Sequence, residues 1–314
     1  MSGSSDKKIN YNLRPSKSIE RKMILEVLKE VCTPKLAKKY KYIGFGSSFF
    51  TDFRLIHRGL NITDMISIES KISNEKRVKF NKPFSCIKLE IGFSQEVLPK
   101  LNWDKKFVAW LDYETSLKGY MFDDLETCTR NSRGGSFIII TLRRDFDGLN
   151  KEKFEEDFGE NVFPGLIEED LQPSKSSATI RKMFVNKITD ILDDAYAAYE
   201  PEKKMLFKQL FDFTYKDEAR MYTFGGVFIE SGDERAFKNY NFNKLEFIGV
   251  EEEPHDISFP IITNKEYHVL NRILPASRKK FLGSKSISFV PMEHKESYYN
   301  AYKFYPAYIE IADM

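Results

Sequence analysis

The sequence predicts an α/β protein with a Rossmann-like, doubly wound and mostly parallel sheet, followed by a smaller α+β C-terminal region. Two observations lead to this prediction. Short apolar runs rich in β-forming residues alternate with stretches of helical spacing, which is typical of βαβ units. The runs are also nearly unbroken, as expected for strands covered on both faces. They lie at residues 42–45, 65–68, 86–91, 107–111 and 137–142.

Helices are expected before and between these strands. Residues 18–31 place apolar side chains among charges at near-helical spacing, and Thr33-Pro34 ends this amphipathic helix. The stretches between the strands predict helices at 51–60, 74–80, 95–101 and 119–131.

The second half of the chain has a different character. Residues 147–172 are acidic, contain Pro and Gly, and predict an irregular lid or linker. A long helix is expected at 174–199, and two β-like runs, 221–230 and 245–250, are expected to pair as a hairpin. Thr263 and Glu266 form a capping box at the start of a short helix that Pro275 ends. We therefore divide the chain into 1–35 (N-terminal segment and helix), 36–146 (Rossmann-like core), 147–172 (lid or linker) and 173–314 (long helix, hairpin and aromatic tail).

Composition sets limits on location and partners. The 314 residues include 49 Lys or Arg and 47 Asp or Glu, so the net charge of +2 does not predict a polyanionic partner. The three cysteines have no metal-like spacing and no disulfide framework, which favours a reducing cytoplasm. The polar start MSGSSDKK and the absence of an 18-residue apolar run predict a soluble protein without a membrane anchor.

The first strand continues into Gly44-Phe45-Gly46-Ser47, where two glycines let the backbone turn sharply beneath a ligand. Phe49 stands where the dinucleotide fingerprint has a third glycine, so NAD or FAD is disfavoured. A plain strand-to-helix turn would also explain the glycines. Glu69 favours a ligand, because it ends the second strand, where Rossmann-type sites use a carboxylate for ribose hydroxyls.

The next two strands end in further polar or glycine residues. Gly92 follows the third strand, while Asp112 and Glu114 follow the fourth. Ligands of open α/β sheets bind outside the carboxyl ends of the strands, so all of these residues are expected at one edge.

This ordered set resembles class I S-adenosylmethionine-dependent methyltransferases. The whole chain is also similar to bacterial proteins described as O-methyltransferases, through LRPSKSIERK at positions 13–22 and YIGFG at 42–46. The resemblance implies S-adenosylmethionine as the cofactor. It also implies that the cofactor site comprises the glycine loop, the ribose-binding acid, the segment lining the adenine and the acid beside the reacting centre, which are Gly44, Gly46, Ser47, Glu69, Gly92 and Asp112.

Asp112 or Glu114 could act as a general base or could cap the following helix, and the sequence favours neither role. No acyl-transfer triad, metal motif or motif of the DNA-base methyltransferases is present, so no metal is expected and a nucleic-acid acceptor is not favoured.

Arg14 and Lys17 could bind an anionic group of a substrate. The alternative is an ordinary charged helix start, with Glu20 and Glu26 as local partners. The tyrosine-rich tail, 298–308, predicts packing or an interface with a protein partner or a second copy.

The leading functional hypothesis is a cytoplasmic methyltransferase that acts on a small hydroxyl compound or a protein side chain. A catalytically inactive, methyltransferase-like binding or scaffold subunit, for example of a bacterial anti-phage defence system, is the alternative. A third hypothesis, a nucleic-acid-binding accessory protein, depends on the basic N-terminal helix and the aromatic tail.

Overall fold

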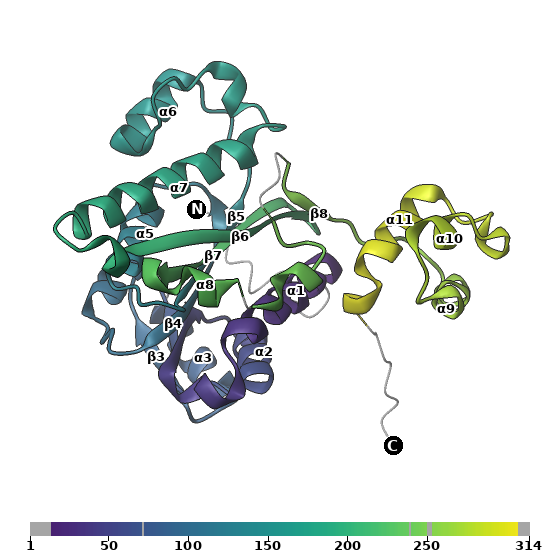
Figure 1. The fold of residues 1–314 in the computed structure, drawn as a ribbon, viewed down its shortest axis with the longest axis horizontal. Coiled ribbons are helices and arrows are strands. Elements are labelled where there is room, and N and C mark those ends of the chain that lie inside the picture. The colour runs from purple at the N-terminus through teal and green to yellow at the C-terminus, as the bar shows by residue number, and fades with distance from the viewer. Residues whose placement is uncertain (1–13, 71, 239, 250–252, 307–314) are drawn as a thin grey trace.

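The computed structural model describes residues 14–70, 72–238, 240–249 and 253–306. Their strands form one eight-stranded sheet in the order β3-β2-β1-β4-β5-β7-β6-β8 (Figure 1). The parts of the N-terminal segment and of the tyrosine-rich tail that include Leu13 and Tyr308 lie outside the described residues, as does Val250.

The five predicted strands are confirmed as neighbours that run parallel to one another. Each apolar run matches one strand, with ends that differ by a few residues. The strands are β1 (Tyr40–Phe45), β2 (Met65–Glu69), β3 (Ile87–Ile91), β4 (Lys106–Ser116) and β5 (Phe137–Arg143).

Helices cover both faces of this sheet, as a doubly wound fold requires. Ile24, Phe53 and Val78 of three helices pack in one apolar cluster against one face. Val97, Leu125 and Ile180 of three others belong to the cluster on the opposite face. The first group comprises α1 (Pro15–Val31), α2 (Thr51–Leu60) and α3 (Glu75–Asn81), and the second comprises α4 (Ser94–Val97), α5 (Tyr120–Arg130) and α7 (Ser176–Ala195).

The hairpin is real, but its predicted pairing is wrong. β7 (Arg220–Glu230) pairs antiparallel with β5 and with β6 (Met205–Lys216), a strand that the apolar pattern did not predict. Polar Lys208, Gln209 and Asp212 interrupt the apolar run of β6. Residues 245–249 form turns instead, and a short β8 (His255–Ile257) pairs parallel with β6. The second half of the chain therefore extends the same sheet.

The acidic segment 147–172 adds no strand, as expected, but it is more ordered than an irregular lid. It contains α6 (Lys151–Phe158), whose N-cap Asn150 accepts a hydrogen bond from the Lys153 N–H. Phe154 and Phe158 are buried in the cluster of α5 and α7. These two aromatic side chains fix the segment to the body of the protein.

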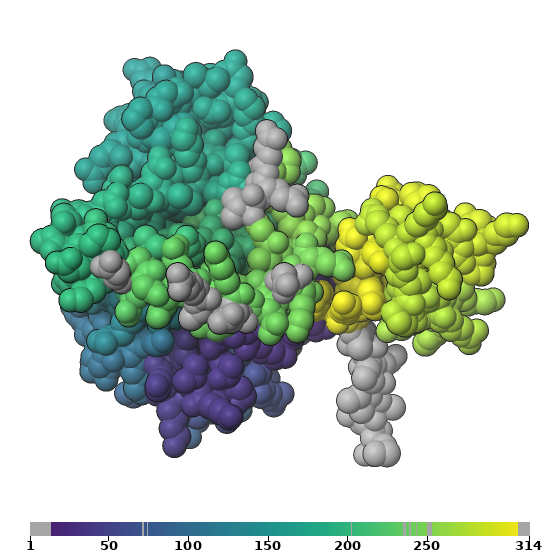
Figure 2. Space-filling view, in the orientation of Figure 1, coloured from purple at the N-terminus to yellow at the C-terminus, as the bar shows by residue number. Residues whose placement is uncertain are grey.

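The last described part forms a small helical unit, residues 261–305, which we call the C-terminal module. It contains α9 (Asn264–Ile273), α10 (Arg278–Leu282) and α11 (Met292–Ala301), which share a separate apolar core that includes Leu270, Phe281 and Tyr298. The predicted capping box is confirmed, because Thr263 and Glu266 exchange side chain to backbone hydrogen bonds. Figures 1 and 2 show the module as a lobe beside the sheet.

The remaining elements are short. Among the described residues they are α8 (Glu234–Phe237) and ten short 3-10 helices at Pro34–Lys39, Ile72–Asn74, Leu98–Lys100, Gly159–Asn161, Glu168–Leu171, Pro201–Lys203, Ser231–Asp233, Asn241–Lys244, Lys285–Ile287 and Tyr302–Phe304. Within the described ranges, we find no helix with the length and apolar character needed to cross a membrane.

Close packing of β6 on β7 predicts that Gly226→Ala destabilises the fold. A Cβ at this position would overlap the Phe207 ring and lie 2.6 Å from the Lys208 carbonyl oxygen, which the sheet holds in place. Overpacking of this kind costs about 1–3 kcal/mol. Chemical denaturation should show this loss of unfolding free energy. Gly119→Ala is the matched control, because its nearest neighbour would be 4.0 Å away; an equal loss in both variants would contradict the explanation.

Candidate functional site

The register of the parallel strands places Glu69, Gly46 and Asp112 in one row. Phe45 pairs with Ile68, so Gly46 and Glu69, each one residue further along the chain, lie level with each other. Gly44 pairs with Trp110, so Gly46 is also level with Asp112, because each lies two residues further along. Neighbouring strands are about 4.8 Å apart, which puts the Cα atoms of Glu69 and Asp112 about 10 Å apart. The two carboxylates therefore flank the glycine loop at the carboxyl edge of the sheet.

Backbone hydrogen bonds connect the loops that follow the first three strands. The Gly46 N–H donates to the Ile68 carbonyl at 3.1 Å, and the Gly92 N–H donates to the Glu69 carbonyl, also at 3.1 Å. Gly92 has a φ of +153°, a conformation that favours glycine. The structure thus brings Gly46, Glu69 and Gly92 together, as the sequence predicted from their positions at strand ends.

Glycine is required in the first loop for reasons of space. A Cβ on Gly46 would overlap the Ser67 hydroxyl, and one on Gly44 would lie 2.9 Å from the Tyr42 hydroxyl and 3.2 Å from the Trp110 carbonyl. The backbone therefore passes close to both neighbouring strands. This close approach explains the glycines more fully than a simple strand-to-helix turn does.

The bulky residues that follow this loop are accommodated by an unusual backbone conformation. Phe50 adopts a left-handed φ of 50° at the N-cap of α2, and its ring is 1% exposed and packs edge-on against Phe53. Ser47 accepts a hydrogen bond from the Phe49 N–H at 3.2 Å, which stabilises the turn. Phe50 thus packs with α2, and a large residue at this position is compatible with the glycine loop.

Several hydroxyls near the loop are buried without a hydrogen-bond partner among the described residues. They belong to Ser48, Thr51 and Ser67. In addition, the N-cap of α2 provides no side-chain hydrogen bond to the helix. Buried hydroxyls and an uncapped helix start are groups that a polar ligand could satisfy.

Asp112 forms a buried ion pair with α1. The Lys17 ammonium lies 3.0 Å from Asp112 Oδ2 and 2.9 Å from Glu20 Oε2. Lys17 and Glu20 are almost fully buried, whereas the Asp112 side chain is 25% exposed. The Lys17 ammonium also lies 5.1 Å from the centre of the Trp110 ring. The N-terminal part of α1 therefore lies directly against the second half of β4.

Two further contacts hold α1 in this position. The Asp217 carboxylate, from the turn between β6 and β7, accepts hydrogen bonds from the Ser16 and Lys17 N–H groups, each at 3.0 Å. Glu20 accepts a hydrogen bond from the Thr223 hydroxyl of β7. The late hairpin thus fixes the N-terminal helix over the strand ends.

In this cluster, burial and the neighbouring opposite charges shift the pKa values in opposite directions. Burial lowers the pKa of Lys17, but the Asp112 and Glu20 carboxylates outweigh it, and the pKa lies well above its ordinary value. Burial raises the pKa of Asp112 and of Glu20, and Lys17 opposes both shifts. Asp112 is therefore a carboxylate of increased basicity.

The structure places the two predicted anion-binding residues differently. Lys17 is fully engaged with two carboxylates, one of which is Glu20, the local partner in the alternative interpretation. Arg14 is the N-cap residue of α1 and is half-buried. Glu26, the other suggested partner, pairs with Lys29 on the surface. A free anion could reach Lys17 only by displacing a carboxylate.

The expectation that Asp112 and Glu114 follow the fourth strand is wrong, because β4 continues beyond both residues. They nevertheless lie in different environments. Glu114 is exposed and belongs to the stretch of β4 where pairing with β5 is irregular. Asp112 lies within the paired part of β4, opposite Thr141. Of the two candidate bases, Asp112 is the one in the row with Gly46 and Glu69.

Sequence reasoning missed two polar contacts around the row. Arg21, one turn after Lys17, forms a largely buried ion pair with Asp52 in the first turn of α2. On the other face, Asp124 accepts hydrogen bonds from Ser94 at 2.5 Å and from Tyr113 at 2.6 Å, and burial raises the pKa of Asp124 to about 6. Neither pairing has a local sequence signal, because the partners are about thirty residues apart or belong to different elements.

The described part of the chain contains no group of three or more His, Cys, Asp or Glu side chains that could hold a metal ion.

Comparison with known proteins decides the family. A model of the family described as "Putative O-methyltransferase" matches residues 9–313, nearly the whole chain. The chain belongs to this family. No protein among curated sequences matches it.

Solved structures with a related fold are distant. An O-methyltransferase from Bacillus cereus in complex with SAH is 15% identical, with 65% of this chain and 79% of that chain covered and a TM-score of 0.35. The O-methyltransferase TomG from Streptomyces achromogenes, in complex with SAM, is 12% identical, with 65% and 78% covered and a TM-score of 0.37. At such low similarity, the family match carries the assignment.

The buried ion pairs predict a large, pH-dependent effect of Lys17→Met. Loss of the cation leaves Glu20 and Asp112 close together without their direct ion-pair partner, which costs about 3–5 kcal/mol of unfolding free energy at pH 7. In the folded variant the two carboxyl groups have raised pKa values, so they take up protons at a higher pH than the same groups of the unfolded chain. The loss of unfolding free energy should therefore shrink as the pH falls towards about 4. Urea denaturation across this range measures both effects.

Lys29→Met is the matched control on the same helix. Lys29 is exposed and pairs with Glu26 at 2.7 Å, so the cost should be about 0–1 kcal/mol. A similar loss in both variants, or a loss in Lys17→Met that does not change with pH, would count against the buried cluster as described.

Proposed function

We propose that this protein is an S-adenosylmethionine-dependent methyltransferase that acts in the cytoplasm on a small hydroxyl compound or a protein side chain. One observation carries the proposal: Glu69 and Asp112 flank the glycine loop in a single row at the carboxyl edge of the sheet. Membership in the family supports the reaction class. The three free cysteines fit a reducing compartment.

The residues of the row suit different parts of this cofactor. Glu69 is placed to accept hydrogen bonds from the ribose hydroxyls, and the loop at Gly92 to lie beside the adenine. Gly44 and Gly46 would allow the ligand to approach the backbone closely. Ser47 and the uncapped start of α2 offer polar groups for the amino-acid part, whose carboxylate a helix N-terminus favours.

When bound, S-adenosylmethionine supplies a methyl group on a sulfonium, so that a C–O bond to the acceptor forms as the C–S bond breaks. The protein has to hold the acceptor in line and remove its proton. Asp112 is the proposed general base, because burial raises its pKa and a quarter of its side chain remains exposed. Lys17 keeps this carboxylate charged and oriented.

The same ion pair favours a second candidate function. Lys17 lies 3.0 Å from Asp112 and neutralises it, which would suit a binding subunit that retains the cofactor without methyl transfer. The two functions share the cofactor site and differ in turnover. Formation of S-adenosylhomocysteine in the presence of an acceptor would distinguish them.

Calorimetric titration with S-adenosylmethionine tests the cofactor site. We expect the wild-type protein to bind, and Glu69→Ala to weaken binding about tenfold or more, because charge-assisted hydrogen bonds contribute about 1.5–3 kcal/mol. Glu90→Ala is the matched control: Glu90 is exposed on β3 and pairs in register with Ile68, so its loss should leave affinity unchanged.

The same titration is carried out with a second variant, Asp112→Asn, and with both ligands. S-adenosylmethionine carries a sulfonium charge that S-adenosylhomocysteine lacks, so loss of the Asp112 charge should weaken the first ligand more than the second, by roughly tenfold. Absence of binding in the wild type would refute the proposal. Equal weakening of both ligands would show that Asp112 does not lie at the reacting centre.

A further inference from the structure

The C-terminal module differs in charge from the rest of the chain. Residues 261–305 contain eight Lys or Arg and three Glu, whereas the remaining sequence contains 41 basic and 44 acidic residues. The balanced total charge hides this difference. The module, which Figure 2 shows as a separate lobe, is thus basic, whereas the rest of the chain is slightly acidic.

The acidic residues of the module do not neutralise this charge. Glu266 is used in the capping box with Thr263, and Glu296 pairs with Arg278 at 3.0 Å. Glu293 lies 3.8 Å from His294. Six other cations are exposed and form no ion pair with any described residue. Five of them are Lys265, Arg272, Lys279, Lys280 and Lys285, and the sixth, Lys303, lies 5.9 Å from the centre of the Tyr302 ring. A cluster of uncompensated charges favours an anionic partner.

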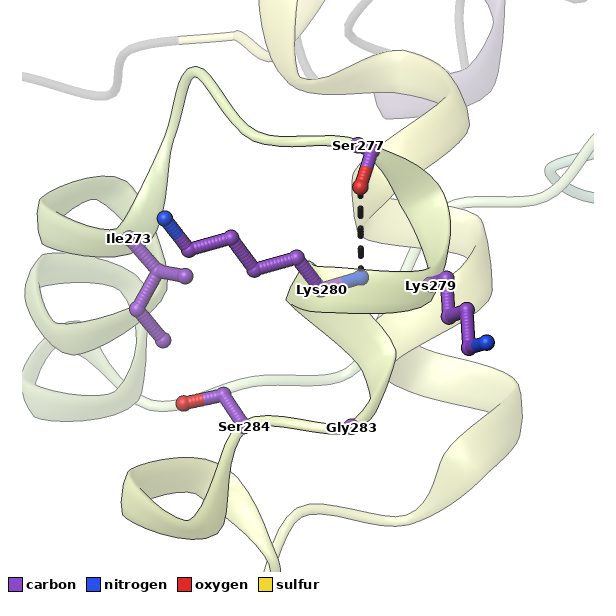
Figure 3. Close-up of a pocket in the computed structure, with 6 residues that line it drawn as sticks. All are labelled: Ile273, Ser277, Lys279, Lys280, Gly283 and Ser284. Atoms are coloured by element: carbon purple, nitrogen blue, oxygen red, sulfur yellow. Dashed lines mark hydrogen bonds between the residues drawn. The ribbon is translucent and has the colours of Figure 1, made fainter.

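An open pocket of about 590 Å³ lies between α9 and α10 in this lobe. Figure 3 shows the Lys280 side chain extended across it towards Ile273, with Ser284 on the other side. The Ser284 hydroxyl lies 2.9 Å from the Ser286 hydroxyl. Ammonium and hydroxyl groups of this kind are typical contacts to phosphate oxygens.

The arrangement suits an extended anion more than a single small one. Five of the six cations are distributed over α9, α10 and the turn that follows, whereas one phosphate needs a few converging groups. Phe289, in the loop before α11, is 68% exposed, and Met292 is 53% exposed. Phe289 follows the exposed Lys285 closely in the sequence. Exposed aromatic rings and basic residues are the two kinds of group by which proteins bind single-stranded nucleic acids.

We propose that the C-terminal module binds the phosphodiester backbone of a nucleic acid, with Lys279, Lys280 and Lys285 at the phosphates and Phe289 against a base. This goes beyond the proposed methyl transfer and does not depend on it. The sequence had linked nucleic acid to the basic N-terminal helix and to the aromatic tail, but Lys17 and Arg21 of that helix are buried in ion pairs. In the structure, the exposed basic residues lie in the C-terminal module instead.

Fluorescence anisotropy of the full chain with labelled 20-nucleotide RNA and DNA of one sequence, single-stranded and duplex, tests the proposal. We expect binding at 50 mM salt to at least one of these probes. The combined variant Lys279→Gln, Lys280→Gln and Lys285→Gln should weaken it at least tenfold. It should also reduce the slope of log K against log salt by about 2–3, since each phosphate contact contributes about 0.7–0.9.

The matched control replaces three lysines elsewhere by Gln: Lys151, Lys153 and Lys208, which form surface ion pairs. Its affinity should equal that of the wild type. Phe289→Ala should weaken single-stranded binding at least fivefold, because stacking contributes about 1–3 kcal/mol per base. Comparison of the affinities for RNA and for DNA shows which of the two nucleic acids the module binds.

Three results would overturn the proposal. The first is no binding to any probe, and the second is an equal loss in the lysine variant and its control. The third is a salt-sensitive dimer in sedimentation velocity that the lysine variant abolishes while no nucleic acid binds, because the partner would then be the acidic segment 147–172 of a second copy. All binding is measured without S-adenosylmethionine, so failure would leave the cofactor site untouched.

Discussion

The buried ion pair between Lys17 and Asp112 is the interaction on which the arrangement of the site depends. It joins α1 to the second half of the central strand β4, level with the glycine loop that follows β1. A buried pair costs desolvation energy, and its attraction offsets that cost only when the remaining groups are also satisfied. Glu20, Thr223 and Asp217 provide these contacts from α1 and the late hairpin. The N-terminal helix and the β6–β7 hairpin, which are far apart in the sequence, thus shape the site together.

This arrangement gives Asp112 properties that a carboxylate in a strand does not have by itself. Burial raises its pKa, Lys17 keeps it charged, and its side chain remains partly exposed. Glu69 lies in the same row but does not share this cluster. Two carboxylates on either side of one loop can therefore serve different purposes, one in binding the ligand and the other near the reaction.

Much of the fold could be predicted from the sequence because its signals are local. Unbroken apolar runs predicted β1 to β5, and helical spacing with a clear end predicted α2 over its full length. The predicted row of strand-end residues followed from parallel pairing alone. β6 was missed because Lys208, Gln209 and Asp212 break its apolar pattern, and the hairpin was then given the wrong partner.

The polar environment of the site could not be predicted in this way. Lys17 and Arg21 look like surface residues of a charged helix start, and only the packing of α1 against β4 and α2 buries them. The basic character of the C-terminal module was hidden in the balanced total, because the residues have to be counted over this module alone and its bounds come from the fold. Local pattern shows where a residue lies along an element, whereas its charge environment comes from contacts distant in sequence.

The most direct test of the cofactor site is a crystal structure of the protein with S-adenosylhomocysteine. The account predicts a ligand at the carboxyl edge of β1, β2 and β4, with both ribose hydroxyls within hydrogen-bonding distance of Glu69 and the backbone of Gly44 and Gly46 beneath it. It also predicts that the sulfur lies on the Asp112 side of the loop. A ligand bound elsewhere, or one that reaches neither Glu69 nor the glycine loop, would contradict it.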